Sequence, residues 1–349
     1  MTEATLIAGP AWVGDMVMAQ VLFRLLKQRQ PDAPIDVIAP AWSAPLLARM
    51  PEVRQSFDLP LGHGQFGLFE RRRIGQSLRG QYTQSILLPN SWKSGLVPFF
   101  AKIPTRTGWL GEARYGLLND WRKLDKAKYP LMIERFVALA FPKGAPLPPA
   151  AELPKPKLAI APQARLEALA RFGLNLNQPL LALCPGAEFG PAKRWPPEHY
   201  ARVSAEKIKQ GWQVWLFGSA KDQADCQAII AGVEPAAREH IFTLAGRTSL
   251  AEAIDLLSCA DAVVSNDSGL MHIAAALDRP LVSIYGSTSP GFTPPLTEIG
   301  EIVQRDDLRC APCFQRECPL GHLDCLNGLE PARVLKALDR LPRALELTH

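Results

Sequence analysis

Short runs of consecutive apolar residues alternate along this chain with longer segments in which apolar residues recur every three or four positions. The continuous runs, which are typical of buried strands, lie at residues 5–9, 35–40, 84–89, 180–186, 212–218, 261–267 and 281–286. Helical periodicity is clearest over residues 18–30, 198–210 and 249–260. Apolar strands that alternate with amphipathic helices predict an α/β fold whose parallel sheets are covered on both faces.

A proline-rich stretch, residues 141–157, interrupts this rhythm with six prolines and is typical of a stiff linker. It divides the chain into an N-terminal domain of residues 1–150 and a C-terminal domain of residues 158–325, and residues 326–349 form a last helix that could pack back on the first domain. Both halves open with a strand, a Gly/Pro turn and a helix. Open parallel sheets bind ligands beyond the C-terminal ends of their strands, so we expect the site in a cleft where the two sheets face each other.

The composition is that of a soluble globular protein, with 47% hydrophobic and 21% charged residues in 349. No apolar run approaches the roughly 20 residues that span a bilayer. The first residues lack a basic region followed by an apolar segment, so we predict no signal peptide. Seven cysteines without export signals indicate reduced thiols and a cytoplasmic protein.

The net charge of +5 is unevenly distributed, because residues 1–145 hold 19 Lys and Arg against 11 Asp and Glu, a balance of +8. The basic half suggests an anionic partner, either a nucleic acid, a phosphorylated sugar or an anionic membrane surface, although a solvated basic face is the simpler alternative. Aromatic residues are not evidently interleaved with these cations, which disfavours nucleic acid. The cations that could form this surface are Arg71, Arg72, Arg73, Lys93, Arg106, Arg114 and Arg122.

The turn that follows the apolar run at 180–186 combines glycines with cations. Gly186 and Gly190 have no side chains, so their backbone N–H groups are accessible. Lys193 and Arg194 come just before the Pro-containing start of a helix. Exposed N–H groups, a helix N-terminus and a cation together predict an anion-binding loop, which also carries Glu188. The spacing is not that of a Walker loop, and a merely charged turn is the alternative.

A second polar turn, Asn266-Asp267-Ser268-Gly269, ends a buried strand and leads at once into an apolar helix. One such residue would be enough to cap the helix, so the excess suggests backbone N–H groups held open for a pyrophosphate. His272, one turn later, is a possible contact, although a lone helical histidine is more often structural.

Two further strand ends point the same way. The turn at 286–289 could reach the same ligand from the side, and Asp222 in the turn "FGSAKDQ" could bind a ribose hydroxyl. Convergence of these turns at one sheet edge predicts that the second domain binds a nucleotide diphosphate.

The first domain has a glycine turn of its own, "GPAWVGDMVMAQ" at residues 9–20, but it presents a carboxylate. Gly14 allows a tight turn, and Asp15 projects from the helix N-terminus, whose dipole keeps it ionised. A general base acting on an acceptor hydroxyl and an ordinary N-cap are equally good interpretations of this segment alone.

The stretch "GHGQFG", residues 62–67, matches a dinucleotide fingerprint, but residues 54–61 before it form a poor strand. We therefore interpret it as a loop. The segment "CAPCFQRECPLGHLDC" is also ambiguous. It could ligate zinc, but the spacing is not a standard finger pattern, disulfides are less favoured in a reducing compartment, and free thiols are the default. The residues concerned are Cys310, Cys313, Cys318, Cys325 and His322.

Taken together, these segments resemble the ADP-heptose:lipopolysaccharide heptosyltransferases. The resemblance covers residues 9 to about 295. The segments that carry it are "GPAWVGDMVMAQ", "LPLGHG", "LPNSWKSGLVPFF", "RTGWLGEARYGLLND", "CPGAEFGPAKRWP", "LFGSAKD" and "SNDSGLMHIAAALDRPLVSIYGSTSP". It implies a GT-B fold of two Rossmann-like domains, with the acceptor on the first and the ADP-sugar on the second, and an inverting transfer without a cofactor or catalytic metal.

The resemblance also implies roles for individual residues. Asp15 would be the catalytic base and Lys193 the cation that neutralises the departing diphosphate. The donor would be ADP-heptose, and the acceptor the Kdo-bearing lipid A core with one heptose, at the cytoplasmic face of the inner membrane. The expected donor contacts are Gly186, Glu188, Lys193, Asp222, Asn266, Asp267, Ser268, Gly269 and His272, and the expected acceptor contacts are Gly14, Arg71, Lys93, Arg106 and Arg114.

Three alternatives remain open at this point. One is the transferase that adds the first heptose, another is a transferase of the same fold that uses a different nucleotide sugar, and the third is a non-catalytic nucleotide-sugar-binding protein. The segments of the resemblance do not reveal which hydroxyl is glycosylated.

Overall fold

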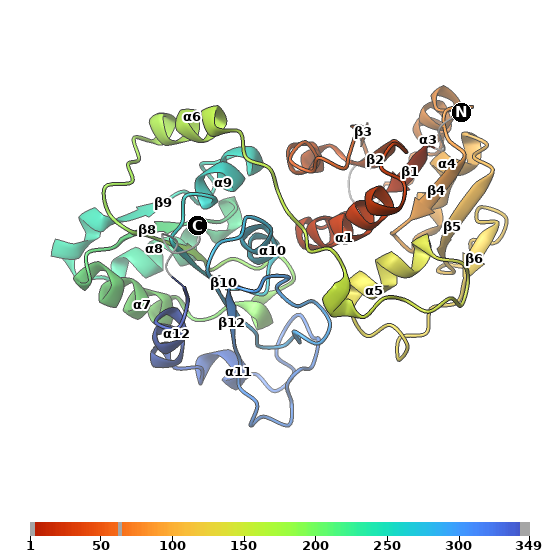
Figure 1. Ribbon diagram of the computed structural model, residues 1–349. Helices are drawn as coiled ribbons and strands as arrows, with labels where there is room; N and C mark the ends of the chain where they lie inside the picture. The colour runs from red at the N-terminus through yellow and green to blue at the C-terminus, as the bar shows by residue number, and fades with distance from the viewer. Residues whose placement is uncertain (1–3, 62–64, 343–349) are drawn as a thin grey trace. The chain divides into compact units, whose positions relative to one another are not determined.

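The computed structural model describes residues 4–61 and 65–342, and the chain forms two compact units, Met1–Leu158 and Ala159–His349 (Figure 1). Each unit holds one six-stranded parallel sheet flanked by helices. Within the described ranges, no helix is long and apolar enough to cross a membrane.

The first sheet has the strand order β3-β2-β1-β4-β5-β6, which is the Rossmann order. Its strands are β1 (Thr5–Ala8), β2 (Ile35–Pro40), β3 (Gln55–Leu59), β4 (Gln84–Leu87), β5 (Thr105–Trp109) and β6 (Asp120–Arg122). The helices of this unit are α1 (Val13–Arg29), α2 (Ala44–Leu47), α3 (Leu68–Ser77), α4 (Leu96–Phe100) and α5 (Met132–Val137). Short 3₁₀ turns join them, among them η2 (Trp92–Gly95).

The proline-rich segment lies within the first unit, whose boundary falls at residue 158. Gln20, fully buried on α1, donates from Nε2 to the carbonyl of Lys157 at 2.7 Å and accepts from its N–H at 3.0 Å. This reciprocal pair fastens the last turn of the segment to α1. The segment that was predicted to be a linker is therefore attached to the first unit, because its backbone forms hydrogen bonds with side chains of that unit.

The second sheet repeats the same topology, with the order β12-β11-β10-β7-β8-β9. Its strands are β7 (Leu180–Cys184), β8 (Gln213–Leu216), β9 (Ile241–Thr243), β10 (Ala262–Asn266), β11 (Leu281–Ile284) and β12 (Gly300–Val303). The helices are α6 (Pro162–Phe172), α7 (Pro197–Lys209), α8 (Gln223–Ala231), α9 (Leu250–Leu257), α10 (Gly269–Ala276), α11 (Asp324–Asn327) and α12 (Pro331–Leu338).

The end of the described chain corrects one expectation. Helix α12 was expected to pack on the first unit, but it packs against α7, β11 and β12 of the second unit. Leu326, Leu329, Val334 and Ala337 are fully buried in the core of that unit. The apolar face of α12 is therefore buried in the core of the second unit.

All seven strands expected from continuous apolar runs are present, and five others were missed. Four of the missed strands lie at sheet edges: β3, β6, β9 and β12. Edge strands are covered on fewer sides, so they do not need a continuous apolar run. Strand β3 also contradicts the view that residues 54–61 form a poor strand, while residues 62–64 of "GHGQFG" lie outside the described residues.

Candidate functional site

The polar turns of the second unit follow the central strands of its sheet, where the chain changes the side to which it adds new strands. Strands β7 and β10 are neighbours, yet the chain continues from β7 toward β9 and from β10 toward β12. This is the topological switch point at which open α/β sheets bind ligands beyond the carboxyl ends of their strands. The turns at 186–194 and 266–272 follow β7 and β10, and the turn at 286–289 follows β11, the strand next to β10.

Lys193 and Asp267 bring two of these turns into direct contact. The Lys193 Nζ lies 2.6 Å from Asp267 Oδ2, and their side chains are only 13% and 4% exposed. Thr288, from the third turn, donates its hydroxyl to the same carboxylate oxygen at 2.6 Å. The predicted convergence of the three turns is thus confirmed, and it places a cation beside the beginning of α10.

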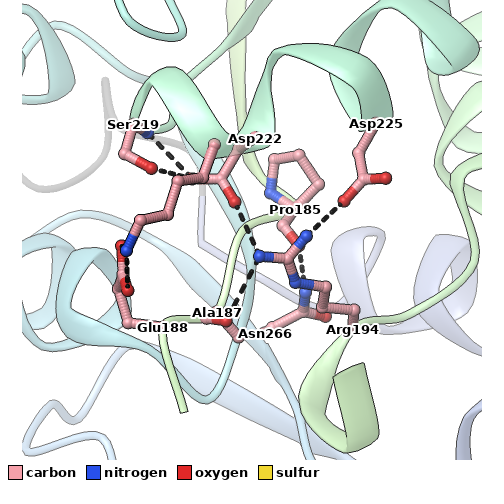
Figure 2. Close-up of polar contacts among 9 residues, drawn as sticks. Pro185, Ala187, Glu188, Arg194, Ser219, Asp222, Asp225 and Asn266 are labelled. Carbon is pink, nitrogen blue, oxygen red and sulfur yellow. Dashed lines mark hydrogen bonds and ion pairs between the residues drawn. The ribbon is translucent and has the colours of Figure 1, made fainter. Parts of the chain in front are cut away.

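Asn266 does not face a ligand but fastens the surrounding backbone. Its side chain is fully buried, and its Oδ1 accepts from the Trp195 N–H at 3.2 Å and from the Tyr200 hydroxyl at 3.0 Å. Its Nδ2 donates to the Pro185 carbonyl at 2.6 Å (Figure 2). All these partners are protein groups, so Asn266 holds the ends of β7 and β10 and the start of α7 together.

Asp222 is also occupied by protein partners. It lies at the end of η6 (Ala220–Asp222), where its Oδ2 accepts from both the N–H and the hydroxyl of Ser219 at 2.8 Å. Its Oδ1 is 3.2 Å from Nη2 of Arg194, which also bridges to Asp225 (Figure 2). The carboxylate that was expected to be available for a ribose is instead buried and satisfied within the protein.

Gly186 has a steric reason to be glycine. A Cβ at this position would come within 2.5 Å of the Asp222 carboxylate, so the turn after β7 can pass only without a side chain. Glu188, in contrast, is solvent-exposed and pairs with exposed Lys221 at 2.9 Å. Such a surface pair contributes little stability and leaves Glu188 accessible.

The start of α10 offers amide groups that the protein does not cap. Ser268 occupies the N-cap position with extended backbone angles, and its side chain makes no capping hydrogen bond. The first-turn N–H groups, beginning with Gly269, have no partner within the helix. Nearby, the fully buried Ser287 hydroxyl has no hydrogen-bond partner among the described residues, although its N–H reaches the Ala192 carbonyl at 3.4 Å. The α10 amides follow Asp267, which pairs with Lys193, and the Ser287 N–H reaches Ala192, the residue before Lys193. Amide and hydroxyl donors close to a cation suit an anion.

His272 lies one turn into α10 and is 4% exposed. Burial lowers its pKa to about 4; Asp267 opposes this shift and Lys193 adds to it. The imidazole is therefore neutral at physiological pH, so any contact with a ligand would be a neutral hydrogen bond and not an ion pair.

The cysteine-rich segment braces these loops. The Arg316 carbonyl accepts from the Ala192 N–H at 3.1 Å, and the Phe314 N–H donates to the Ser287 carbonyl at 2.7 Å. The Arg316 guanidinium also lies over the Phe189 ring. Two of the three polar turns therefore rest on residues 314–316.

The cysteines themselves are free thiols. Burial is the main cause that raises the pKa of Cys325 to about 11, with the three neighbouring thiols adding to it, and backbone N–H groups lower the pKa of Cys318. In the part of the chain that the structure describes, no group of His, Cys, Asp and Glu side chains is arranged to hold a metal ion.

In the first unit, Asp15 lies in the first turn of α1, just beyond the carboxyl end of β1. The N-cap position belongs to Trp12, so Asp15 does not fill the N-cap role considered for it. Both Gly14 and Asp15 are partly exposed. A carboxylate in the first turn of a helix is stabilised in its ionised form by the helix dipole.

Arg114 was expected to contact an acceptor, but it is fully buried. Its guanidinium donates to the carbonyls of Trp109 at 2.6 Å and Pro89 at 2.7 Å, and to the Ser94 hydroxyl at 2.8 Å. Burial lowers its pKa to about 10, so it stays charged at neutral pH. Arg114 therefore clamps the loops after β4 and β5 and has no surface to offer a ligand.

Two other predicted acceptor contacts also serve the fold. Arg71 is buried on α3 and donates to the Phe66 carbonyl at 2.8 Å. Arg106 on β5 donates to the carbonyls of Leu117 and Ile103, both at 2.7 Å. Lys93, on η2, is only partly exposed, and its Nζ donates to the Gln65 carbonyl at 3.4 Å. Composition counts charges but does not reveal which of them point inward toward carbonyl oxygens.

Sequence reasoning singled out the turn at 286–289 but none of its residues. The structure adds Thr288 through its bond to Asp267, and Ser287 through its unsatisfied buried hydroxyl. The signal that could have found them is the repetition of hydroxyl residues in "GSTSP" directly after a buried strand.

Comparisons with known proteins match the chain to one family of enzymes. A family model described as glycosyltransferase family 9 (heptosyltransferase) matches residues 71–324. Lipopolysaccharide heptosyltransferase 2 of Salmonella typhimurium is 52% identical over 345 residues, covering 96% of this chain and 97% of that protein. The protein of the same name from Escherichia coli K12 is 48% identical with the same coverage. The solved structure of E. coli ADP-heptose lps heptosyltransferase II is 45% identical and has a TM-score of 0.85, covering 97% of this chain and 98% of that one.

Proposed function

The chain belongs to glycosyltransferase family 9, the heptosyltransferases, and on this basis we propose that it transfers heptose from ADP-heptose to the first heptose of the lipopolysaccharide inner core. It is a glycosyltransferase with the expected GT-B class of fold, since two Rossmann-like sheets are present and the solved relative matches over nearly the whole chain. The observation that carries the proposal is the Lys193–Asp267–Thr288 cluster at the switch point of the second sheet.

In the proposed reaction, the second unit binds the diphosphate of the donor. The first-turn amides of α10 and the Lys193 ammonium face the position where negative charge grows as ADP departs. Asp267 and Thr288 hold the ammonium and its loop in place before the donor arrives. A fixed cation of this kind stabilises the transition state without having to reorganise during the reaction.

We propose Asp15 as the general base. The acceptor hydroxyl oxygen attacks the anomeric carbon of the heptose, its proton passes to the Asp15 carboxylate, and the bond from that carbon to the diphosphate oxygen breaks on the opposite face. The configuration at the anomeric carbon is thereby inverted. General-base assistance typically contributes about 10²- to 10⁴-fold in rate.

The first unit would bind the lipid-linked acceptor. Exposed tryptophans follow three of its strands at the edge where Asp15 lies, namely Trp12, Trp42 and Trp92, and Lys93 is next to the last of them. Aromatic faces and a cation suit a phosphorylated saccharide. Because that acceptor is anchored in lipid, we propose that the enzyme works as a peripheral protein at the cytoplasmic face of the inner membrane.

The test is incubation with ADP-heptose and purified core acceptors that carry one heptose or none. We expect ADP release and the mass gain of one heptose only with the heptosylated acceptor. Asp15→Asn should keep ADP affinity and lose turnover by about 10²-fold or more, whereas Asp125→Asn, an exposed control in the same unit, should keep both. Near-normal turnover of Asp15→Asn would remove it from the reaction, and transfer to the acceptor without heptose would reassign the substrate.

A further inference from the structure

A cationic pocket lies in the first unit, near the N-terminal ends of the strands of its sheet. We infer that this pocket binds the phosphate group of a membrane lipid. The pocket has a volume of about 320 Å³ and is lined by residues that connect α3 with the following turn and α4 with β5. The lining residues are Arg79, Phe99, Phe100, Lys102, Ile103, Pro104 and Arg106.

Three of the lining side chains are cations and none is acidic. The side chain of Lys102 is exposed, and its ammonium makes no hydrogen bond or ion pair with any described residue. Arg79 is also exposed and spends one N–H on the Phe100 carbonyl at 3.0 Å, which leaves the rest of its guanidinium available. Arg106 is tied to backbone carbonyls but adds its positive charge to the wall. Three cations without a carboxylate make a site for a doubly or singly charged oxyanion.

The backbone holds one of these cations in an unusual conformation. Lys102 has a φ of 54°, in the left-handed region that non-glycine residues seldom adopt. The turn that begins there ends α4 and leads into β5, so the ammonium is displayed by a fixed turn between two regular elements.

The pocket combines this charge with apolar surface. Phe99 is 42% exposed, forms an edge-to-face pair with Phe100 and lies near the Arg106 guanidinium. Exposed aromatic rings next to cations are typical of proteins that rest at the membrane–water interface, where the cations meet phosphates and the rings meet the acyl boundary. A soluble phosphate would use the cations alone, so the aromatic rim favours a lipid as the source of the phosphate.

The place of the pocket separates it from the reacting groups. Asp15 follows the carboxyl end of β1, whereas Lys102 and Pro104 precede the start of β5. Because the strands are parallel, Asp15 and the pocket lie at opposite ends of the strands of one sheet. A strand of five residues spans about 16 Å. The pocket is therefore a second contact with the membrane, beyond the saccharide that reacts. This inference rests on the proposed function in one respect, because a lipid-linked acceptor is what brings the enzyme to a membrane.

The experiment measures binding of the full-length protein to vesicles of phosphatidylcholine with and without phosphatidylglycerol, and separately to inorganic phosphate. Lys102→Asn removes the charge with a residue that tolerates the left-handed backbone, and Arg79→Gln removes the second free cation. Lys126→Asn is the matched control, because Lys126 is an exposed lysine of the same unit outside the pocket. Equal thermal midpoints for all variants verify that they are folded.

We expect Lys102→Asn and Arg79→Gln each to weaken binding to the anionic vesicles about fivefold, the effect of about 1 kcal/mol per basic residue at an anionic surface. Lys126→Asn should bind like the parent. Equal losses for Lys102→Asn and Lys126→Asn would overturn the inference, because they would mean diffuse attraction without a pocket. Binding of inorganic phosphate that depends on Lys102, without binding to vesicles, would overturn the assignment to a lipid.

Turnover of a deacylated, water-soluble acceptor separates this inference from the proposed function. Lys102→Asn should transfer heptose to that acceptor as fast as the parent protein, because the pocket lies away from the reacting groups. If the parent itself transfers no heptose, the proposed function fails, and the vesicle measurements still decide the pocket.

Discussion

Lys193 and Asp267 form the most deeply buried ion pair of the candidate site, and replacing them singly and together tests whether they act as a unit. Lys193→Met keeps the length of the side chain and removes its charge. Asp267→Asn keeps the shape of the carboxylate and removes its charge. The double variant has neither charge, so the two single variants and the double variant form a cycle with the parent protein.

The structure sets the size of the expected effects. With Lys193 replaced, a carboxylate that is only 4% exposed keeps just the Thr288 hydroxyl as a side-chain partner. Breaking a buried ion pair by removing one partner costs about 3–5 kcal/mol. Because Lys193 retains 13% exposure, we expect the free energy of unfolding of the second unit to fall by about 3 kcal/mol. The double variant should cost less than the sum of the single variants by about 2 kcal/mol, since no buried charge remains.

ADP affinity provides the functional arm of the same cycle. Lys193→Met should remove the proposed charge-assisted contact to the diphosphate, worth about 1.5–3 kcal/mol, which corresponds to a dissociation constant raised roughly 10- to 150-fold. Asp267→Asn removes a negative charge from beside the diphosphate, so electrostatics should not weaken binding. Calorimetric titration with ADP and urea unfolding give the two sets of numbers. Strict additivity of the unfolding energies, within about 0.5 kcal/mol, would refute the coupling, and unchanged ADP affinity in Lys193→Met would refute its contact with the diphosphate.

Three further predictions follow from burial. Arg114→Ala should lower the free energy of unfolding by about 4 kcal/mol, because it strands several buried carbonyls; an intact urea midpoint with weakened acceptor binding would instead return Arg114 to the acceptor site. The pKa of about 4 for His272 lies below its ordinary 6.5, so the unfolded state binds the extra proton between these values and stability falls as the pH drops from 6.5 to 4. His272→Gln should remove up to roughly 3 kcal/mol of this dependence, measured by urea unfolding along a pH series, and an unchanged pH slope would count against a neutral His272. Thr288→Val should reduce kcat while Thr288→Ser restores it, since only the hydroxyl reaches Asp267; failure of serine to rescue activity would point to the methyl group.

The sequence was informative where burial is complete. The central strands β1, β2, β4, β7, β8, β10 and β11 require apolar residues on both faces, and a continuous run predicts them. At the edges, polar residues on the uncovered side break the run, as in the "QSFDL" of β3. The first unit ends at Leu158, just after the proline-rich segment. The hydrogen bonds of Gln20 to Lys157 attach this segment to α1, and no local sequence pattern reveals such a long-range contact.

The meeting of the three polar turns was predictable from the sequence, whereas the directions of their side chains were not. Strand-end turns of parallel strands must meet at one edge, so contact between Lys193 and Asp267 follows from topology. The direction of a side chain does not follow from topology. Asp222 and Arg114 were expected to face ligands, but both turn toward protein groups that would otherwise be unsatisfied. A buried carbonyl or amide attracts a charged side chain as effectively as a ligand does, and the sequence does not distinguish the two.

Helix α12 is part of the core of the second unit, and this constrains the order in which the two units fold during synthesis on the ribosome. The hydrophobic core of the second unit draws on residues from Leu181 to Leu338, so it cannot close until almost the whole of that segment has emerged. The first unit is a compact unit that ends at Leu158, so it can complete its folding during synthesis. A nascent chain arrested near residue 310 would therefore display a finished first unit followed by an open, protease-sensitive sheet.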